Sequence, residues 1–341
     1  MTRLAFSTRI VRWQRQHGRH GLPWQGTRDP YRVWLSEVML QQTQVTTVLA
    51  YYARFLQRFD TVQALAEAPL DDVLALWSGL GYYSRARNLH RCAQAVVAQH
   101  GGAFPASAER LAMLPGIGRS TAAAIAAFCF GERVAIFDGN VKRVLSRVLG
   151  FDGDLASAGP QQQLWSAAQA LLPGRDVEVY TQGLMDLGAT VCVTKRPACE
   201  RCPVVADCRA RAAGEPERYP VKSRKLRRSQ RENALLWLQH GPRLWLVQRP
   251  LEGVWAGLWA FPEYPSTTLL ESTTAEWPGQ GEWLPSVRHA LTHFDWAMHP
   301  LCWTLPPRAA SPVAPEGGRW FTLDEALAMG LPAPIRRLLR A

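Results

Sequence analysis

Two acidic residues, Glu37 and Asp138, occur in sequence contexts that suit acid–base chemistry. Glu37 has Val33, Trp34 and Leu40 as helical neighbours, and an apolar setting raises the pKa of a carboxyl group until it can donate a proton near neutral pH. Asp138 opens a Gly-Asn turn into another predicted helix. Cleavage of a glycosidic bond needs two carboxyl groups in unlike settings, because one protonates the leaving group and the other stays ionised beside the developing cation. The structural alternative for Glu37 is a residue at the rim of the fold whose carboxylate reaches water.

A tight turn, Leu114–Gly118, ends twenty residues before Asp138. Pro115 fixes one φ angle, while Gly116 and Gly118 allow backbone conformations that are closed to other residues. With no side chains in the way, the amide groups that start the next helix can meet a phosphate directly. A phosphate-binding turn that is followed by a carboxylate at the start of a helix predicts chemistry on nucleic acid. The alternative is a plain helix–turn–helix corner in which Asp138 only caps a helix.

Four of the seven cysteines fall in one short segment with the spacing C-x6-C-x2-C-x5-C, namely Cys192, Cys199, Cys202 and Cys208. Zinc is the usual metal for four cysteines, and an iron–sulfur cluster is the competitor. The spacing lacks the paired CxxC pattern of zinc ribbons. The odd cysteine total, without a secretory signal, favours a reducing compartment and argues against disulfides. Arginines that suit phosphate contacts surround the segment: Arg196, Arg201, Arg209 and Arg211.

The charge of the chain is distributed unevenly. The 341 residues include 39 Lys and Arg and 28 Asp and Glu, for a net charge of +11. Residues 1–231 carry 31 basic against 18 acidic side chains, whereas residues 232–341 carry 8 against 10. This distribution predicts that residues 1–231 bind a polyanionic partner and that the nearly neutral residues 232–341 do not. No apolar run approaches the length of a membrane span.

Mainly helical elements must position these residues. Apolar residues recur at helical spacing in residues 31–40, 45–59, 70–77, 86–98, 107–114, 120–129 and 141–149. Asp29-Pro30 suits the start of the helix that carries Glu37, with Asp as N-cap and Pro in the first turn. Residues 216–231 are rich in basic side chains and predict an exposed linker. These side chains are Arg218, Lys222, Arg224, Lys225, Arg227, Arg228 and Arg231.

The chain beyond residue 232 has the pattern of a β domain. Ala234–Leu238 and Leu244–Val247 flank His240-Gly241-Pro242, which predicts a β-hairpin. Nine of the fourteen Trp residues lie in this part, so we expect an aromatic core. A short amphipathic helix is predicted at Leu323–Met329.

Five segments together resemble the MutY-type adenine DNA glycosylases, a family in the endonuclease III branch of the helix-hairpin-helix DNA glycosylase superfamily. They are LPW at 22–24, SEVMLQQTQV at 36–45, WSGLGYYSRARNL at 77–89, LPGIGRSTA at 114–122 and DGNVKRVL at 138–145. The cysteine spacing also matches this branch, whose cysteines hold a [4Fe–4S] cluster. The resemblance therefore implies one [4Fe–4S] cluster on the four cysteines in place of zinc.

The resemblance further implies an enzyme that removes adenine mispaired with 8-oxoguanine or guanine in duplex DNA. Glu37 matches the general acid of the family, which protonates adenine N7, and Asp138 matches the carboxylate that stabilises or bonds C1′ before water attacks. Filling the gap left by an extruded base is physically necessary, because extrusion costs unstacking energy. The remaining implied residues contact the catalytic groups or the DNA: Asn140 beside Asp138, Gln182 near the flipped adenine, Gln42, Thr43 and Tyr82 in the base stack, Lys142 on a phosphate, Gly116 and Gly118 in the hairpin, and Trp24 within the LPW segment.

Ser120 separates two kinds of enzyme within this branch. Lyases of the endonuclease III type carry a Lys at the matching position as the Schiff-base nucleophile, and a hydroxyl group cannot form an imine. The expected enzyme is therefore monofunctional and leaves an abasic site, not a nicked strand. Lys142 can trap the abasic aldehyde adventitiously, but we assign it to phosphate contact.

The C-terminal part resembles a Nudix-like fold in the segments LVQRP at 246–250 and GLWAFP at 257–262. It lacks the carboxylate array of Nudix hydrolases after Pro262, so no Mg²⁺ site for pyrophosphate hydrolysis is expected. In MutY-type proteins a Phe-Ser-His loop here reads 8-oxoguanine. This chain has Leu291, Thr292 and His293 at those positions, which keeps the hydroxyl and the imidazole but replaces the aromatic ring.

We therefore predict a mainly α-helical catalytic domain over residues 1–215, a basic linker over 216–231, and a smaller α+β Nudix-like domain for 8-oxoguanine recognition over 232–341. The expected molecule is a monomer that acts on double-stranded DNA with A·8-oxoguanine or A·G mispairs, at the nucleoid in a bacterial cytoplasm and away from membranes.

Three alternative functions compete with this prediction. An endonuclease III-like lyase on oxidised pyrimidines is opposed by Ser120, a non-catalytic damage-binding protein requires Glu37 or Asp138 to lie away from the pocket, and a Nudix hydrolase is opposed by the missing acids.

Overall fold

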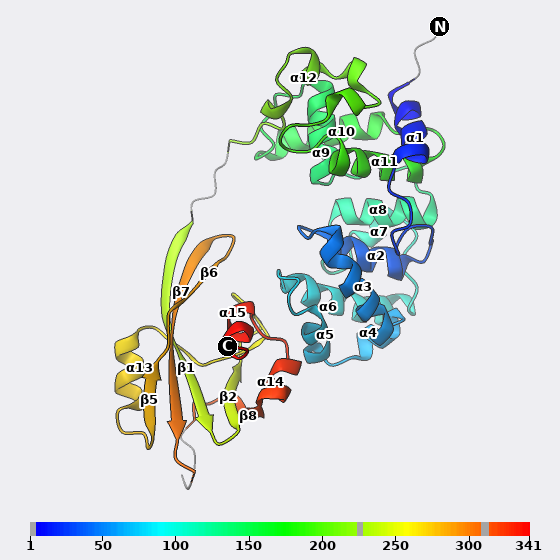
Figure 1. Cartoon of the computed structure of the whole chain (residues 1–341). Coiled ribbons are helices and arrows are strands. Elements are labelled where there is room, and N and C mark those ends of the chain that lie inside the picture. Colours follow the sequence, from blue (N-terminus) through cyan, green and yellow to red (C-terminus); the bar gives the residue numbers. More distant parts are fainter. Residues whose placement is uncertain (1–4, 224–227, 308–313) are drawn as a thin grey trace. The chain divides into compact units, whose positions relative to one another are not determined.

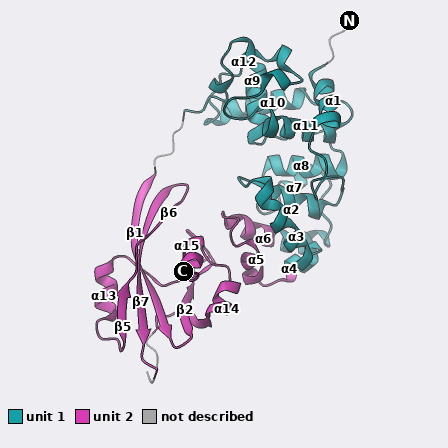
Figure 2. Ribbon diagram, in the orientation of Figure 1, with its two compact units in different colours: residues 1–66, 91–224 teal, residues 67–90, 225–341 magenta. Residues whose placement is uncertain are grey.

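The computed structural model describes residues 5–223, 228–307 and 314–341. The chain forms two compact units, which are coloured separately in Figure 2. Residues 1–66 and 91–224 make the first, here named the helical unit, and residues 67–90 and 225–341 make the second, the sheet unit. Among the described residues, no helix combines the length and the apolar character needed to cross a membrane.

The helical unit consists of short helices joined by tight turns (Figure 1). Its α-helices are α1 Phe6–His17, α2 Pro30–Leu40, α3 Val45–Arg58, α4 Val62–Glu67, the second part of α6 Ser84–His100, α7 Ala108–Leu111, α8 Arg119–Phe130, α9 Gly139–Leu149, α10 Ala158–Ala170, α11 Val177–Thr190 and α12 Arg209–Ala212. Single 3-10 turns occur at Cys199–Arg201, Val205–Asp207 and Pro216–Arg218. With α5 Leu70–Trp77 in the sheet unit, all seven predicted helical segments are confirmed.

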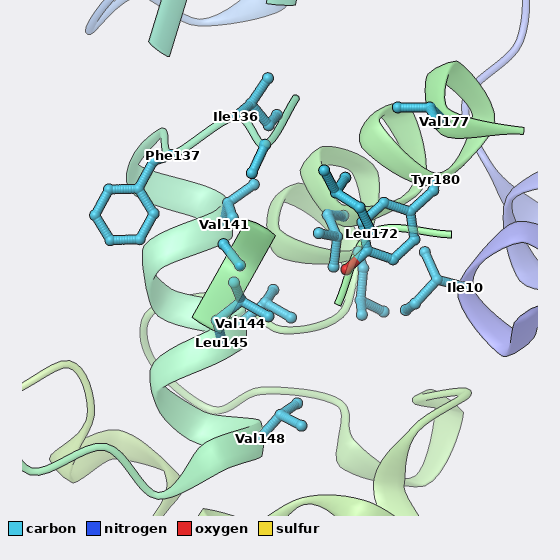
Figure 3. Packing of buried hydrophobic residues seen from close by; sticks show 14 of the residues in the cluster. Ile10, Ile136, Phe137, Val141, Val144, Leu145, Val148, Leu172, Val177 and Tyr180 are labelled. Atoms are coloured by element: carbon cyan, nitrogen blue, oxygen red, sulfur yellow. The ribbon is translucent and has the colours of Figure 1, made fainter. Parts of the chain in front are cut away.

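The core of the helical unit is centred on α9 (Figure 3). Val141 and Val144 are buried on this helix and belong to one hydrophobic cluster with Ile10 of α1 and Tyr180 of α11. Each such buried side chain stabilises the fold by about 1.5–3 kcal/mol relative to exposure. Because α9 is anchored along one whole face, the position of Asp138 at its N-terminus is set by the core.

The predicted turn Leu114–Gly118 joins α7 to α8 as a helical hairpin. Gly116 has a φ of 73°, in the left-handed region that favours glycine. A Cβ atom on Gly118 would meet nothing within 4 Å, so the start of α8 is open. The residues Ala122–Ala127 of α8 are buried and mostly alanine, and small side chains allow α8 to pack closely on α2.

The sheet unit contains one eight-stranded sheet in its described residues. The strands are β1 Ser229–His240, β2 Arg243–Gln248, β3 Trp259–Ala260, β4 Glu263–Tyr264, β5 Gln280–Trp283, β6 Val287–Ala290, β7 Phe294–Leu305 and β8 Gly318–Thr322. The main path runs β3-β2-β1-β7-β5, with β1 parallel to β7 from the pair Ser229 and Phe294 to the pair His240 and Leu305. The predicted hairpin is confirmed by the antiparallel pairing of β1 with β2.

Both faces of this sheet are covered. The helix α13 Thr267–Thr274 packs on one face, and α14 Leu323–Ala328 and α15 Ala333–Leu338 pack on the other (Figure 1). Coverage on both sides explains why residues 233–236 of β1 are buried in succession. The predicted amphipathic helix is confirmed as α14, and Trp259 and Trp296 contribute to the expected aromatic core.

The compact units divide the chain differently from the predicted domain boundaries. Residues 67–90 belong to the sheet unit, because α5 packs with C-terminal segments that are far away in sequence. Most of the described residues of the predicted linker are exposed, among them Arg218, Lys222 and Arg228, as predicted. Tyr219 is the exception because it is buried, and β1 begins at Ser229, inside the predicted linker. Arg224, Lys225 and Arg227 lie outside the described residues. The division into a catalytic and a recognition domain stays a prediction.

Candidate active site

A cavity of about 1200 Å³ opens in the helical unit between α2, α8, α11 and the segment before α2. It brings together side chains from distant parts of the chain. The predicted site residues that line it are Trp24, Glu37, Thr43, Ser120, Asp138, Asn140 and Gln182. Both carboxyl groups that the sequence singled out therefore face one pocket.

Glu37 lies on α2, whose N-cap is Asp29 and whose first residue is Pro30, as predicted. Its neighbours Val33 and Trp34 are 4% and 1% exposed. Burial raises the pKa of Glu37 to about 7, and the nearby charge of Asp138 adds to the rise. Near neutral pH Glu37 therefore exchanges its proton readily, as a general acid must.

Asp138 is held in a more polar setting as the N-cap of α9. Its Oδ1 accepts a hydrogen bond from the Val141 amide at 2.7 Å, and its Oδ2 accepts one from Asn140 Nδ2 at 3.2 Å. The pKa of Asp138 is raised overall, because burial outweighs the lowering effect of these two hydrogen bonds and of Arg143. No hydrogen-bond donor to Glu37 is found among the described residues. The two carboxyl groups thus have unlike surroundings, which is the arrangement that distinguishes an acid from an ionised stabiliser.

Ser120 fixes the backbone that leads to Asp138. It lies in the first turn of α8, and its Oγ accepts a hydrogen bond from the Phe137 amide at 3.0 Å. The hydroxyl group is therefore occupied in holding the residue next to Asp138. This contact gives Ser120 a structural role at the site that its sequence position did not reveal.

Arg143, one turn into α9, connects the site with the cysteine segment. Its Nη2 donates to Asn140 Oδ1 at 2.8 Å, and its Nε donates to the Cys192 carbonyl at 2.7 Å. Since a guanidinium only donates and a carboxylate only accepts, the amide of Asn140 is oriented by Arg143 on one side and Asp138 on the other. The cysteine segment and the Asp138 carboxylate are thus linked through the side chains of Arg143 and Asn140.

The four cysteines of the predicted metal site line one small cavity beside α9. Their sulfur atoms are not paired in disulfides. The guanidinium of Arg147, a residue that is 1% exposed, donates to Cys192 Sγ at 3.3 Å. Within the described ranges, no three Cys, His, Asp or Glu side chains converge as the ligands of a single ion would. Four thiols around one cavity with a buried cation at its edge fit the donor set of an iron–sulfur cluster.

Gln182 lies on α11 and lines the pocket above a buried ion pair. Asp186 is fully buried and accepts hydrogen bonds from Arg19 Nε at 2.7 Å and from Gln182 Nε2 at 2.9 Å. Because the amide nitrogen of Gln182 donates to a carboxylate, its carbonyl oxygen is left as the acceptor for a pocket ligand. This orientation suits a ligand that presents an amino group.

Two predicted DNA-contact residues outside the pocket have strained backbones. Gln42 has a φ of 57° and Tyr82 a φ of 48°, both unusual for residues other than glycine. Gln42 is exposed, and the Tyr82 side chain is 45% exposed although it is aromatic. Backbone strain of this kind persists only where the surrounding structure enforces it, and it is enriched at functional sites.

The remaining predicted residues also lie outside the pocket. Gly116 and Gly118 are in the hairpin turn, and Lys142 is half-buried with its Nζ 4.9 Å from the centroid of the Phe137 ring. Thr292 and His293 are exposed in the turn between β6 and β7. The structure therefore gathers Glu37 and Asp138 in one pocket together with Trp24, Thr43 and Gln182, and it places the other predicted DNA-contact residues outside this pocket.

Four residues of the site were missed by sequence reasoning: Arg19, Arg143, Arg147 and Asp186. Arg143 and Arg147 are four residues apart in α9, and this spacing could have indicated one shared helical face. Asp186 offered no such signal, because its partner Arg19 is 167 residues away in the chain.

Two family models match the chain. The model for HhH-GPD superfamily base excision DNA repair proteins matches residues 35–168, which contain Glu37, Ser120 and Asp138. The NUDIX domain model matches residues 233–341. The predicted fold class, a helix-hairpin-helix domain followed by a Nudix-like domain, is confirmed by these matches.

Similar proteins match nearly the whole chain. The chain is 33% identical over 346 residues to the adenine DNA glycosylase of Buchnera aphidicola subsp. Acyrthosiphon pisum (strain APS), with 99% of this chain and 98% of that protein covered. It is 34% identical to the adenine DNA glycosylase of Homo sapiens, with 98% of this chain and 73% of that protein covered. Among solved structures, a thermostable thymine-DNA glycosylase aligns with a TM-score of 0.55 and 27% identity, over 61% of this chain and 95% of that one.

Proposed function

The chain belongs to the adenine DNA glycosylase family, and from that premise we propose that it hydrolyses the N-glycosidic bond of adenine mispaired with 8-oxoguanine or guanine in duplex DNA. The observation that carries the proposal is the shared pocket of Glu37 and Asp138, in which Glu37 has a pKa of about 7. A damage-binding protein without catalysis would not need an acid and an ionised carboxylate side by side.

The proposed reaction uses the two carboxyl groups in sequence. Glu37 gives its proton to adenine N7, the bond between C1′ and N9 breaks, and the electron pair leaves with adenine. Asp138 stabilises the positive charge that develops at C1′. Water then adds to C1′ and loses a proton to the solvent, which leaves an abasic deoxyribose in an intact strand. Asn140 and Arg143 keep Asp138 in place through the hydrogen bonds described above.

We assign the adenine contact inside the pocket to Gln182. Its carbonyl oxygen is free of the Asp186 contact and suits the exocyclic amino group of adenine, which is a donor. Trp24 forms part of the pocket wall and is itself held by an edge contact to Tyr52 with ring centroids 5.3 Å apart. A flat aromatic wall suits the face of a purine.

Gln42, Thr43 and Tyr82 are proposed to occupy the base stack when adenine is extruded. The strained backbones of Gln42 and Tyr82 support this assignment, since both side chains are held outward at an energetic cost. Thr43 lines the pocket mouth next to Gln42. Aromatic stacking on an exposed base is worth about 1–3 kcal/mol, enough to offset part of the unstacking cost.

Phosphate contacts are assigned to the open start of α8 and to a pair of lysines. Gly116 and Gly118 leave the first amide groups of α8 accessible, as a phosphate site requires. Burial lowers the pKa of Lys142; the nearby charge of Asp138 opposes this fall and that of Lys222 adds to it. Two neighbouring cations beside the catalytic carboxylate suit the phosphates that flank the extruded nucleotide.

The turn of Leu291, Thr292 and His293 is proposed to read 8-oxoguanine. Thr292 and His293 are exposed there, so their hydroxyl and imidazole groups are accessible to a base. Pyrophosphate hydrolysis is disfavoured, because α13, which follows the Nudix-like strand segment, carries only one acidic residue, Glu271. A single monomer acting at the bacterial nucleoid in the cytoplasm stays a prediction.

The four cysteines are proposed to hold one [4Fe–4S] cluster, which is the cofactor that the endonuclease III-like family typically carries. Cys199→Ser should remove most of the visible absorbance of the purified protein, because one of four thiolate ligands is lost. Cys302→Ser, in β7 and outside the segment, should leave the absorbance unchanged. A colourless, zinc-containing and active protein would contradict the assignment.

The function is tested by incubating the protein with duplexes that contain A·8-oxoguanine, A·G, A·T or thymine glycol, and splitting each product with and without alkali. We expect cleavage of the adenine strand of A·8-oxoguanine and A·G only after alkali, because Ser120 cannot form an imine. Strand breaks without alkali would indicate a lyase. Retention of adenine in every duplex would remove the proposed activity.

A further inference from the structure

The Tyr82 side chain lies on a loop with positive φ angles at three positions, two of which are glycines that adopt them without strain. Gly79, Gly81 and Tyr82 have φ values of 107°, 72° and 48°. Tyr82 carries a side chain in the left-handed region, which costs about 1 kcal/mol or more in the absence of compensating contacts. Residues 78–83, here named the Tyr82 loop, therefore need outside contacts to keep this conformation.

Part of the support comes from residues beside the loop. Trp77 Nε1 donates to the Gly81 carbonyl at 3.1 Å, and Arg85 Nη2 donates to the carbonyls of Leu80 and Gly81, both at 3.2 Å. Arg85 is 7% exposed, so its guanidinium is committed to the loop interior. These contacts hold the middle of the loop and leave its two ends to be fixed.

Both ends of the Tyr82 loop are tied to one carbonyl group of the C-terminal segment. Ser78 Oγ donates to the Leu331 carbonyl at 3.2 Å, and the Tyr83 hydroxyl donates to the same oxygen at 3.1 Å. The Tyr83 hydroxyl also accepts the Gly79 amide at 3.3 Å. Leu331 and Tyr83 are buried, so these hydrogen bonds are shielded from water.

Arg336 of α15 contacts both the Tyr82 loop and the segment that contains Leu331. Its Nη2 donates to Ser78 Oγ at 3.1 Å and to the Met329 carbonyl at 2.8 Å, while Nη1 donates to the Leu327 carbonyl at 2.7 Å. One guanidinium thus bridges the Tyr82 loop and the segment that presents Leu331. The backbone at Gly330 lies close to α5, because a Cβ atom on Gly330 would lie 3.0 Å from Leu74 Cβ.

We propose that residues 327–336 position the Tyr82 loop, and that Tyr83, Ser78 and Arg336 are positioning residues through which the Nudix-like domain controls base-stack opening by Tyr82. The proposal rests on the proposed role of Tyr82 in the base stack. It adds a second role to the C-terminal domain, which then supports the Tyr82 loop besides reading the opposite base. The Tyr83 hydroxyl contacts both the Leu331 carbonyl and the Gly79 amide, so its loss should loosen both ends of the loop.

The test uses full-length protein and a duplex with 2-aminopurine beside the adenine of an A·8-oxoguanine pair, whose fluorescence rises when the stack opens. Tyr83→Phe and Ser78→Ala should each lower this rise and the single-turnover rate of adenine excision about fivefold, the order expected for one buried hydrogen bond. Ser78→Thr should restore both signals. Thr274→Val is the matched control, because it removes a buried hydroxyl that donates within α13 of the same unit.

A double substitution separates positioning from general destabilisation. In a Tyr82→Ala background, Tyr83→Phe should have no further effect on either signal, because the positioned side chain is already missing. An equal fivefold loss in both backgrounds, or a loss no larger than that of Thr274→Val, would overturn the proposal. If Tyr82→Ala itself changes neither signal while adenine is still excised, the proposed role of Tyr82 fails, and the inference fails with it.

Discussion

Glu37→Gln should reduce the rate of adenine excision by about 100- to 10,000-fold, the range over which a positioned general acid acts. The glutamine amide has nearly the shape of the carboxylic acid but cannot transfer a proton, so binding to the A·8-oxoguanine duplex should persist. Single-turnover excision and duplex binding, measured on the same preparation, separate the two effects. Glu67→Gln, an exposed residue of α4, is the matched control and should excise at the normal rate.

The pH dependence of the unmodified protein follows from the same residue. The pKa of Glu37 is about 7, so the protonated form that donates the proton prevails below that pH. Above it, excision should fall about tenfold per pH unit, since the protonated fraction decreases by that factor. A flat profile between pH 6 and pH 9 would show that Glu37 does not supply the proton.

The stability of Glu37→Gln should change in the opposite direction from its activity. Because burial raises the pKa of Glu37, the folded protein binds more protons than the unfolded chain between the ordinary pKa and about 7. The destabilisation by ionised Glu37 is therefore absent at low pH and complete above about pH 7. We expect a higher melting temperature for Glu37→Gln at pH 8 and a smaller difference toward pH 5, measured by thermal scans at a fixed rate.

Asp138→Asn should lower excision by about 100- to 1000-fold, the effect of losing one electrostatic contact to the charged transition state. Asparagine is a good N-cap residue, so its side-chain oxygen can still accept from the Val141 amide and α9 should keep its start. The loss is then a loss of charge near C1′. Ser266→Ala, which removes the N-cap contact of α13, should reduce stability slightly and leave excision unchanged.

The pH profile of Asp138→Asn provides a second test, because it reports the pKa of Glu37. The charge of Asp138 raises the pKa of Glu37, so its removal should lower that pKa. The fall of the residual activity with pH should therefore begin at a lower pH in Asp138→Asn than in the unmodified protein. An unchanged pH profile together with normal excision would mean that the two carboxyl groups do not act as a pair.

Local patterns in the sequence were sufficient to predict the helices that carry the site residues. The apolar spacing of α2 and α9, the N-caps Asp29 and Asp138, and the cysteine spacing depend on residues a few positions apart. Helix periodicity and capping act over that same short range. For this reason the helices, the β-hairpin and the identity of the two carboxyl groups could be predicted before any tertiary contact was known.

The tertiary packing of distant segments decided which side chains lie together. Glu37 acquires its raised pKa only when folding places it in a shared cavity with Asp138. The ion pair of Arg19 with Asp186 spans 167 residues, and the contact of Ser78 with Leu331 spans 253. No periodic pattern encodes such pairs, because they arise from the packing of whole elements. From the sequence alone, the helices, the two candidate carboxyl groups and the cysteine spacing could be predicted, because these patterns depend on residues close together in the chain. The tertiary structure decided that both carboxyl groups are buried beside one pocket and which C-terminal segment contacts the Tyr82 loop.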